Sequence, residues 1–228
     1  MMKLLKLSCA VAITSILITG IAVAKDSKSA PETEQEKLLY FMGTQLGQSL
    51  MLLQLSDAEL DQVLLGTRDA VQGKAIKLDP TVYGPQLTKF GEERHKIRLE
   101  EERPLAKAYL ARMAAEDGAR TPASGLIFLA LKPGSGATPT STSMVELDYH
   151  GTLRDGTVFD SSVVRGQAVQ IPLERVHPCW QEGIALLKEG GKAKITCPAK
   201  LAYQDRGLAN IPPGAAITFE VELVKIVR

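Results

Sequence analysis

Residues 174–183, ERVHPCWQEG, contain the densest set of side chains that could do chemistry. They include the single Trp of the chain, Trp180, with His177 and Cys179 just before it. A His and a Cys two positions apart could ligate a metal, act as a nucleophilic pair or take part in redox chemistry. A Trp in the same stretch instead indicates an apolar surface. The stretch is therefore either a reactive centre or part of an apolar pocket.

The sequence lacks the further residues that a reactive centre needs. Its other His, His95 and His150, are far from His177, and neither a C-x-x-C nor an H-x-x-x-H spacing occurs. A metal site needs three or four converging ligands, and a thioredoxin-like redox site needs C-x-x-C. A Cys-His nucleophile also needs a third group that orients the His, and none is evident. We therefore expect no metal and no other cofactor.

The first 24 residues have the form of a secretory signal peptide. Lys3 and Lys6 give a basic start, apolar and small residues follow, and Ala22, Val23 and Ala24 form an A-x-A cleavage pattern. An uncleaved anchor helix is the alternative, but the apolar run is short for a membrane span and contains Ser and Thr. We therefore expect cleavage after Ala24 and export to the periplasm or the outer cell surface, with no membrane span in the mature chain.

Charge and cysteine content set further limits on the mature chain. Residues 1–24 hold two of the 27 basic residues and none of the 26 acidic ones, so a formal charge of −1 remains. This balance gives no indication of nucleic-acid binding. Two cysteines remain, Cys179 and Cys197. An isolated pair in an oxidising compartment favours a disulfide, and two free thiols are the alternative because the distance between them is unknown.

Residues 25 to about 120 follow helical patterns. Residues 25–34 are polar and contain Pro, which predicts a flexible leader. In residues 35–53 apolar side chains recur at spacings of three and four, which predicts an amphipathic helix, and the S-x-x-E capping box at Ser56 begins a second one. The apolar core of these helices is small for independent stability. We therefore expect residues 35–78 to form a dimerisation domain, with a self-contained helical hairpin as the alternative.

A third, long helix is expected at residues 79–118. Asp79 suits the N-cap and Pro80 the first helical position. The middle of this helix is charged on every face, which is typical of a helix that bridges two bodies through solvent. Pro104 lacks a backbone N–H and is expected to kink the helix or to divide it in two.

Residues 124–228 follow strand patterns. Asp155 and Gly156 predict a tight hairpin turn. One helical stretch is expected at residues 180–188, followed by two Gly. The fold class is therefore α+β: an antiparallel sheet wrapped on one short helix, preceded by an all-α dimerisation domain and a long bridging helix. The expected strands are at residues 126–131, 144–149, 193–197 and 217–226.

Three blocks in this half resemble the FKBP-type peptidyl-prolyl cis-trans isomerase family: VELDYHGTLRDGTVFDSS, VHPCWQEGIALLKEGGKAKITCP and LAYQDRGLANIPPGAAITFEVELVKI. They occur in the order and at the spacing of the family, and the resemblance covers residues 124–228. The helical half is similar, in helix pattern and domain order, to the dimerisation domain of the macrophage-infectivity-potentiator subgroup. The resemblance implies isomerisation of X-Pro bonds in unfolded or proline-containing exported proteins, which assists their folding.

An isomerase of this kind needs neither a nucleophile nor a metal. The barrier of ~18–20 kcal/mol arises from amide resonance, so the site must bind the twisted amide better than the planar one. A dry aromatic pocket does so because it penalises the more polar planar amide. The resemblance implies catalytic roles for Tyr149, Asp160 and Tyr203. It also implies that the substrate is bound by Phe159, Val169, Val176, His177 through its backbone N–H, Trp180 as the floor, and Phe219.

Several positions depart from the family pattern. The family usually has an aliphatic residue at His177, Gly at Cys179, bulky residues near Val169 and Ile171, and Gly at Gln204. Smaller walls predict a wider, shallower pocket, with weaker binding of macrolide inhibitors and a lower isomerase rate. The alternative function is a weakly catalytic or non-catalytic periplasmic chaperone or surface binding protein with a degenerate pocket.

Overall fold

The computed structural model describes residues 30–208 and 210–227. The expected signal peptide at residues 1–24 and the first half of the expected leader, residues 25–29, lie outside this range. The chain divides into two compact units between Tyr40 and Phe41. Within the described residues, no helix combines the length and the apolar character that a membrane span requires.

Two helices begin the described chain, α1 (Glu34–Gln48) and α2 (Asp57–Val71). A short 3₁₀ helix, η1 (Met51–Leu53), lies between them in the sequence. The capping box predicted at Ser56 is formed, because its side chain accepts from the Glu59 N–H and the Glu59 carboxylate accepts from the Ser56 N–H. None of the residues of α1 or α2 is buried. Both helices therefore present apolar side chains that nothing in the described chain covers.

The third helix, α3 (Pro80–Ala114), begins as predicted, with Asp79 as N-cap accepting from the Thr81 N–H at 2.8 Å. It runs without a break through Pro104, so the expectation that Pro104 divides it is wrong. The physical reason is tertiary packing, because burial of the last three turns offsets the lost hydrogen bond. The buried apolar side chains at this end of α3 form a hydrophobic cluster with residues of the strand domain. Its members are Ala106, Tyr109, Met113, Ile127 and Ala216.

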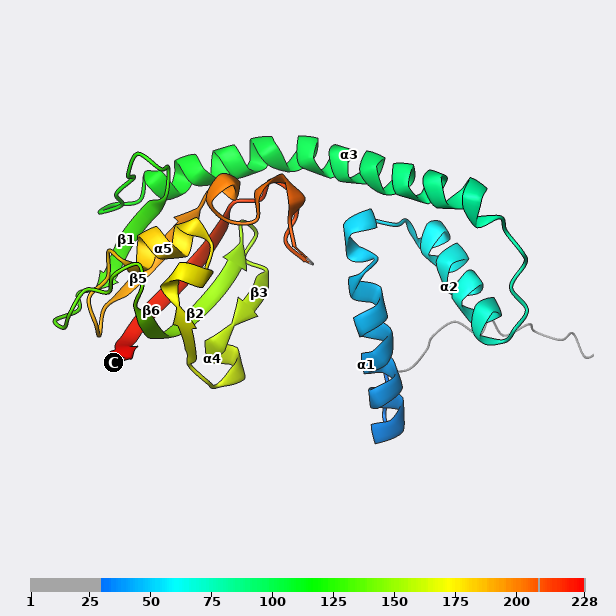
Figure 1. The fold of residues 1–228 in the computed structure, drawn as a ribbon, viewed down its shortest axis with the longest axis horizontal. Coiled ribbons are helices and arrows are strands. Elements are labelled where there is room, and N and C mark those ends of the chain that lie inside the picture. The colour runs from blue at the N-terminus through cyan, green and yellow to red at the C-terminus, as the bar shows by residue number, and fades with distance from the viewer. Residues whose placement is uncertain (1–29, 209, 228) are drawn as a thin grey trace, which may run out of the picture. The chain divides into compact units, whose positions relative to one another are not determined.

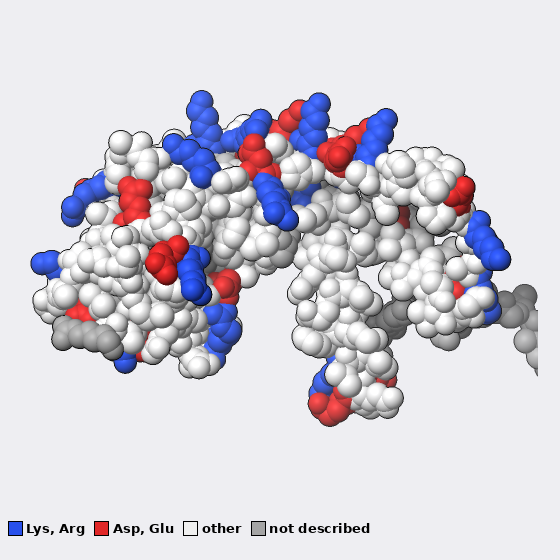
Figure 2. All heavy atoms as spheres, in the orientation of Figure 1, with Lys and Arg blue, Asp and Glu red and all other residues white. Residues whose placement is uncertain are grey.

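The charged part of α3 is not solvated all round, contrary to the sequence pattern. Glu102 is only 7% exposed, and it accepts a hydrogen bond from Nε of Arg154 at 3.0 Å. Just beyond the end of the helix, Glu116 pairs with Lys194 at 2.9 Å. Other acidic and basic side chains of α3 alternate on the surface (Figure 2). The C-terminal half of α3 is therefore part of the strand domain rather than a free bridge.

The strand domain is an antiparallel sheet with the order β1-β5-β6-β2-β3, and β4 pairs with the first half of β2 (Figure 1). This confirms the predicted α+β class. The first three expected strands are confirmed as β1, β2 and β5, and the last as β6, whereas β3 and β4 were not predicted. The strands are β1 (Ile127–Lys132), β2 (Met144–Leu153), β3 (Val158–Ser161), β4 (Val169–Pro172), β5 (Lys192–Cys197) and β6 (Ile217–Val227).

The helices of this domain differ from the single one predicted at residues 180–188. The helix on the sheet, α5 (Pro178–Ile184), begins and ends earlier, because His177 caps it and Pro178 occupies its first position. A second short helix, α4 (Ser162–Arg165), follows β3 and ends at Gly166 with φ 70°. Short 3₁₀ helices complete the domain: η2 (Leu173–Arg175), η3 (Ala199–Leu201) and η4 (Gln204–Arg206).

Alternation along the central strands gives the sheet two different faces. Ile195, Phe219 and Val221 belong to the main core with α5. Thr218, next to Phe219, faces the other way and lies 2.6 Å from the Tyr109 hydroxyl of α3. The sheet is therefore covered by α5 on its apolar face and by the end of α3 on the other.

Candidate functional site

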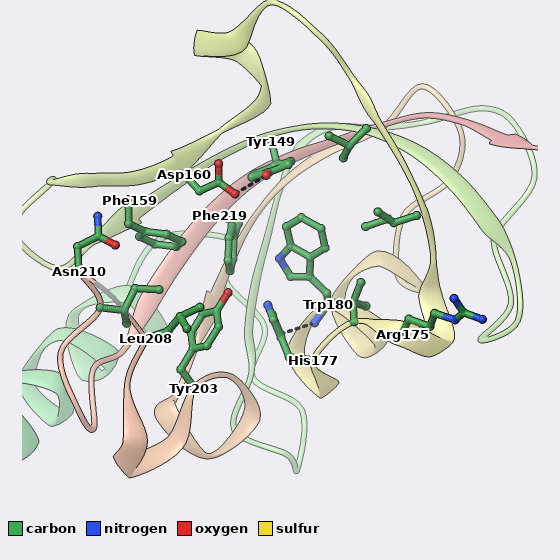
Figure 3. Close-up of a pocket in the computed structure, with 14 residues that line it drawn as sticks. Tyr149, Phe159, Asp160, Arg175, His177, Trp180, Tyr203, Leu208, Asn210 and Phe219 are labelled. Carbon is green, nitrogen blue, oxygen red and sulfur yellow. Dashed lines mark hydrogen bonds between the residues drawn. The ribbon is translucent and has the colours of Figure 1, made fainter. Parts of the chain in front are cut away.

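A pocket of about 590 Å³ lies in the strand domain (Figure 3). Strands, loops and the start of α5 all contribute to it. The nine catalytic and substrate-binding residues named from the sequence all line it: Tyr149, Phe159, Asp160, Val169, Val176, His177, Trp180, Tyr203 and Phe219. Side chains that were not assigned to the site also line it: Ile171, Arg175, Leu208, Asn210 and Ile211.

The floor and walls of the pocket are aromatic and packed edge to face. The Trp180 ring lies 5.0 Å from the Tyr149 ring at 76°, and 5.0 Å from the Phe219 ring at 74°. Phe159 lies 5.4 Å from Phe219 at 83°. Such pairs add about 0.5–1.5 kcal/mol each beyond the burial of their surface. The walls are therefore rigid before any ligand enters.

Gly151 on β2 allows two of these rings to approach the sheet. A Cβ atom at this position would lie 2.8 Å from Cζ of Phe159 and 3.0 Å from Cε1 of Phe219. Contacts this short would displace both rings, so Gly at this point of β2 is a requirement of the pocket.

A hydrogen-bonded triad closes one edge of the pocket. The Tyr149 hydroxyl donates to Oδ2 of Asp160, and Arg165 donates to Oδ1 of Asp160 and, at 2.9 Å, to the Tyr149 hydroxyl. The Asp160 side chain is 45% exposed, so the triad lies at the border with solvent. The sequence reasoning missed Arg165. The signal that could have located it is the single helical turn that Ser161 caps and Gly166 ends.

The charges of this triad are set by burial and by its own hydrogen bonds. Burial raises the pKa of Asp160, but hydrogen bonds from Tyr149 and Arg165 and the Arg165 charge outweigh it, so the pKa lies below its usual value. Burial, with the Asp160 hydrogen bond, raises the pKa of Tyr149. At neutral pH the pocket edge therefore holds a carboxylate, a guanidinium and an un-ionised phenol.

The side chain of His177, for which only the backbone N–H was given a role, also belongs to the pocket. Its ring lies inside the pocket, 5.7 Å from each of the rings of Trp180, Tyr203 and Phe219. Nδ1 of His177 accepts the Trp180 backbone N–H at 3.3 Å, which turns the ring inward. Burial lowers the pKa of His177 to about 4, so the ring is uncharged at neutral pH.

Two hydrogen-bond donors on residues that line the pocket have no bonded partner in the described protein. Nε1 of Trp180 is buried and has no hydrogen-bond acceptor among the described residues. The Tyr203 hydroxyl points into the pocket (Figure 3). Burial, followed by the Asp160 charge, raises the pKa of Tyr203, so its hydroxyl keeps its proton. The Tyr203 hydroxyl can therefore donate to an acceptor on a ligand in the pocket.

The loop after Tyr203 forms another wall, which the sequence reasoning did not assign. Leu208 and Ile211 pair with each other through their backbones and line the pocket with Asn210. Gln204, where the family usually has Gly, adopts φ 54°. This conformation suits Gly better than a residue with a Cβ atom. The signal that could have found this wall is an apolar residue pair, Leu208 and Ile211, immediately before Pro212 and Pro213.

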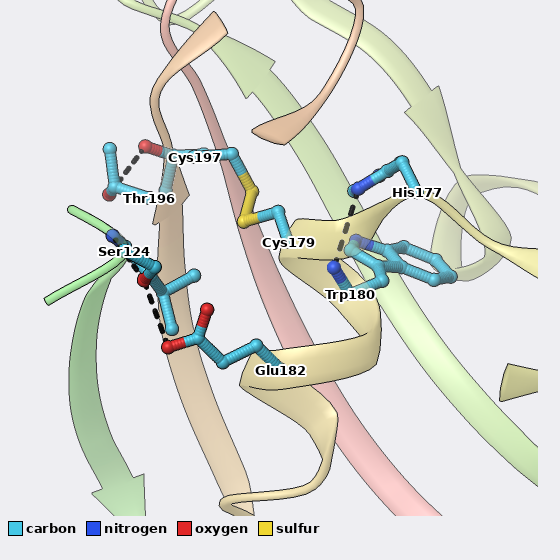
Figure 4. Close-up of a disulfide and its surroundings, with 9 residues drawn as sticks. Ser124, His177, Cys179, Trp180, Glu182, Thr196 and Cys197 are labelled. Atoms are coloured by element: carbon cyan, nitrogen blue, oxygen red, sulfur yellow. Dashed lines mark hydrogen bonds between the residues drawn. A yellow bond between two sulfur atoms is a disulfide. The ribbon is translucent and has the colours of Figure 1, made fainter. Parts of the chain in front are cut away.

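The two cysteines form a disulfide beneath the pocket (Figure 4). The Cα atoms of Cys179 and Cys197 are 5.8 Å apart, and both side chains are fully buried. The bond joins α5 to β5 immediately before Trp180. In this oxidised state neither sulfur can act as a nucleophile. No cluster of three or more His, Cys, Asp and Glu side chains that could hold a metal occurs in the described part of the chain.

Comparison with known proteins identifies two family domains. The model of the FKBP-type peptidyl-prolyl cis-trans isomerase matches residues 136–224. The model of the domain amino-terminal to FKBP-type peptidyl-prolyl isomerase matches residues 35–129. The two matches together span most of the described chain.

Individual relatives share both halves. A probable FKBP-type peptidyl-prolyl cis-trans isomerase FkpA of Neisseria meningitidis is 40% identical over 197 residues, which cover 82% of this chain and 72% of the relative. The FKBP-type 22 kDa peptidyl-prolyl cis-trans isomerase of Escherichia coli is 36% identical over 199 residues, covering 86% of this chain and 97% of the relative. The crystal structure of FkpA from Escherichia coli matches with a TM-score of 0.62 and 29% identity, covering 86% of this chain and 98% of that chain.

Proposed function

Because the chain belongs to the family of FKBP-type peptidyl-prolyl cis-trans isomerases and isomerises X-Pro bonds, we propose that the pocket above Trp180 is where the bond rotates. The single observation that carries this assignment is the aromatic enclosure: Tyr149, Phe159 and Phe219 surround a floor, Trp180, that is 6% exposed. A proline ring is compact and apolar, and the open face of the indole offers it an apolar surface.

Rotation in this pocket needs no covalent step. In the planar amide, resonance puts negative charge on the carbonyl oxygen, and twisting the bond removes much of that charge. Aromatic walls remove water from the carbonyl oxygen and offer it few hydrogen bonds in return. The planar amide, whose oxygen carries more charge, therefore loses more solvation free energy than the twisted amide. Each ~1.4 kcal/mol of this difference accelerates rotation about tenfold.

Polar groups at the edges would hold the substrate chain in place. The Tyr203 hydroxyl and the backbone N–H of His177 are donors for the carbonyls that flank the proline. The Asp160 carboxylate, held by Arg165, fixes the Tyr149 ring through its hydroxyl. Asp160 and Tyr149 thereby act on the reacting amide through the shape and polarity of the wall. Val169 and Val176 contribute an open aliphatic side, which accommodates varied residues and favours weak binding of macrolide inhibitors.

The test is an isomerase assay on an Ala-X-Pro-Phe type peptide, with the aggregation of an unfolded client measured in parallel. Asp160→Ala should lower kcat/KM, because the Tyr149 wall loses its hydrogen-bond acceptor. Suppression of aggregation should be unchanged in the same variant. An Asp160→Ala variant with full activity would contradict the assignment of the pocket. A wild type without measurable turnover but with intact suppression of aggregation would favour the alternative, in which client binding is the main function and the pocket is degenerate.

We further propose that the chain is exported and acts as a homodimer on proline-containing exported proteins. The A-x-A pattern at residues 22–24 supports export, and the disulfide suits an oxidising compartment such as the periplasm or the outer cell surface. Apolar side chains on α1 support dimerisation, since Leu38, Phe41 and Leu46 expose 67%, 59% and 61% of their surface. A patch of this kind marks an interaction surface. Much of α1 carries no charge in Figure 2.

A further inference from the structure

The side chain of His177 occupies a place in the pocket that the proposed reaction does not use. Its ring stacks on Phe219 at 26°, with the centroids 5.7 Å apart, and contacts Trp180 and Tyr203 at the same separation. An aliphatic side chain could fill this space, but it could neither accept a hydrogen bond nor take up a proton. This chain therefore has an ionisable imidazole packed against three aromatic rings of the pocket.

The same ring fixes the start of α5. His177 is the N-cap, and its Nδ1 accepts from the backbone N–H of Trp180, three residues later (Figure 4). This acceptor must be unprotonated, so the proton of the neutral ring lies on Nε2. The other edge of the ring interacts with the Leu201 backbone, two residues before Tyr203. The imidazole thus connects the floor of the pocket to the segment that carries Tyr203.

We propose that His177 is a positioning residue of the isomerase pocket, whose uncharged ring holds Trp180 through Nδ1 and packs against Phe219 and Tyr203. A proton taken up from solvent at Nδ1 replaces the acceptor by a donor, removes the cap and places a cation against the indole. The pocket then loses both its shape and its ability to exclude water. This inference rests on the proposed function, since it takes Trp180 as the surface on which the proline lies.

The surroundings of the ring oppose its protonation. Burial lowers the pKa of His177 to about 4, and the interaction with the Leu201 backbone offsets only part of this. The carboxylate of Asp160 already binds Arg165 and Tyr149, so it is not free to pair with an imidazolium. The residues that α5 and β6 place against the ring, Trp180 and Phe219, do not ionise. The other ionisable groups that line the pocket in the described chain are Tyr149 on β2, Asp160 on β3, Arg175 on η2 and Tyr203 between η3 and η4.

The experiment compares the full-length wild type with His177→Asn and His177→Ile. Asn keeps an acceptor that can cap α5 without ionising, and Ile keeps apolar volume without an acceptor or a charge. His95→Asn on α3 makes the same chemical change outside the pocket. The kcat/KM of an Ala-Ala-Pro-Phe type peptide is measured by NMR exchange, which needs no coupling protease, from about pH 7 to about pH 3.5. Fluorescence of Trp180, the only Trp, reports on the floor directly, and circular dichroism identifies the pH range in which each protein stays folded.

In the wild type and His95→Asn, we expect kcat/KM to fall about twofold at a pH of about 4 and further below it, with a parallel change in Trp180 emission. In His177→Asn and His177→Ile, kcat/KM and Trp180 emission should both be independent of pH over the range in which the protein is folded. The same step in either variant would overturn the inference, because another group would then be responsible. A third outcome is a change in Trp180 emission only in the proteins that retain His177, while kcat/KM stays constant with pH in all of them. This outcome would support the contact between His177 and Trp180, but it would contradict the assignment of this pocket as the site of isomerisation.

Discussion

Arg165 donates a hydrogen bond of 2.9 Å to the hydroxyl of Tyr149, sixteen positions earlier in the chain. Its other terminal nitrogen binds Asp160, so one guanidinium holds both members of the pocket edge. The contact depends on the short helix α4, whose single turn brings Arg165 back over β3. A guanidinium presents its donors in a rigid fork, which an ammonium group does not.

Replacing Arg165 should therefore weaken catalysis even though it touches neither the floor nor the proline. We expect Arg165→Gln to lower kcat/KM by about 3- to 10-fold, the equivalent of one net hydrogen bond. Arg165→Lys should recover only part of the loss, because it restores the charge without the fork. NMR exchange on a proline peptide measures kcat/KM of both variants. Arg68→Gln on α2 is the control for the loss of a positive charge. Equal activity of Arg165→Gln and the control would show that the triad does not matter for the reaction.

The Tyr203 hydroxyl should contribute to rate rather than to folding. Removing it in Tyr203→Phe leaves the ring contact with His177 in place but deletes a donor. We expect kcat to fall by about 2- to 10-fold, with the melting temperature unchanged. Tyr83→Phe, on an exposed part of α3, is the matched control. A large drop in melting temperature for Tyr203→Phe alone would assign the hydroxyl a structural role instead.

The stability of the protein should fall with pH in a window set by His177. Its pKa in the folded state is about 4, against 6.5 for an unperturbed His. Between these values the unfolded chain binds the proton more strongly, so stability is full above about pH 6.5 and is lost as the pH falls towards about 4. The loss from this group is roughly 3 kcal/mol. Urea unfolding at several pH values should show a shallower dependence for His177→Asn, and an identical dependence would contradict the assignment.

Reducing the disulfide should lower the stability of the strand domain. Cys179 and Cys197 are 18 positions apart, and closing a loop of this size in the unfolded chain is worth about 3 kcal/mol. For a chain of this length that corresponds to about 6–12 °C in melting temperature. Calorimetry with and without dithiothreitol measures the shift, and a Cys179→Ala/Cys197→Ala variant should show none on adding reductant. A wild type that melts at the same temperature in both conditions would mean that the bond is absent or without effect.

The exposed apolar side chains of α1 should hold the dimer together. We expect Phe41→Glu to yield a monomer in sedimentation velocity, because a charge would have to be buried in the interface. Gln45→Glu places the same charge on α1 without removing an apolar side chain and should remain a dimer. Isomerase activity on a short peptide should be unchanged in both. A dimer that survives Phe41→Glu would place the interface elsewhere.

The sequence by itself determined nine of the 14 residues that line the pocket and most of the elements that carry them. Strand patterns predicted four of the strands, and the capping pattern at Ser56 predicted the start of α2, because these signals depend on neighbouring residues only. The same was true of Asp79 and Pro80 at the start of α3. The pocket residues were found because their blocks occur together in the order of a known family.

Only the tertiary structure decided how several of these residues are used. Pro104 stays inside a continuous helix and Glu102 is buried because the sheet domain supplies packing and an Arg partner, which α3 alone does not reveal. Arg165 joins the site through a turn too short to show a period. The inward position of His177 depends on a cap that forms only when α5 begins at Pro178. Sequence patterns report local preference, whereas burial, charge and the direction of a side chain depend on contacts between segments that are distant in the chain.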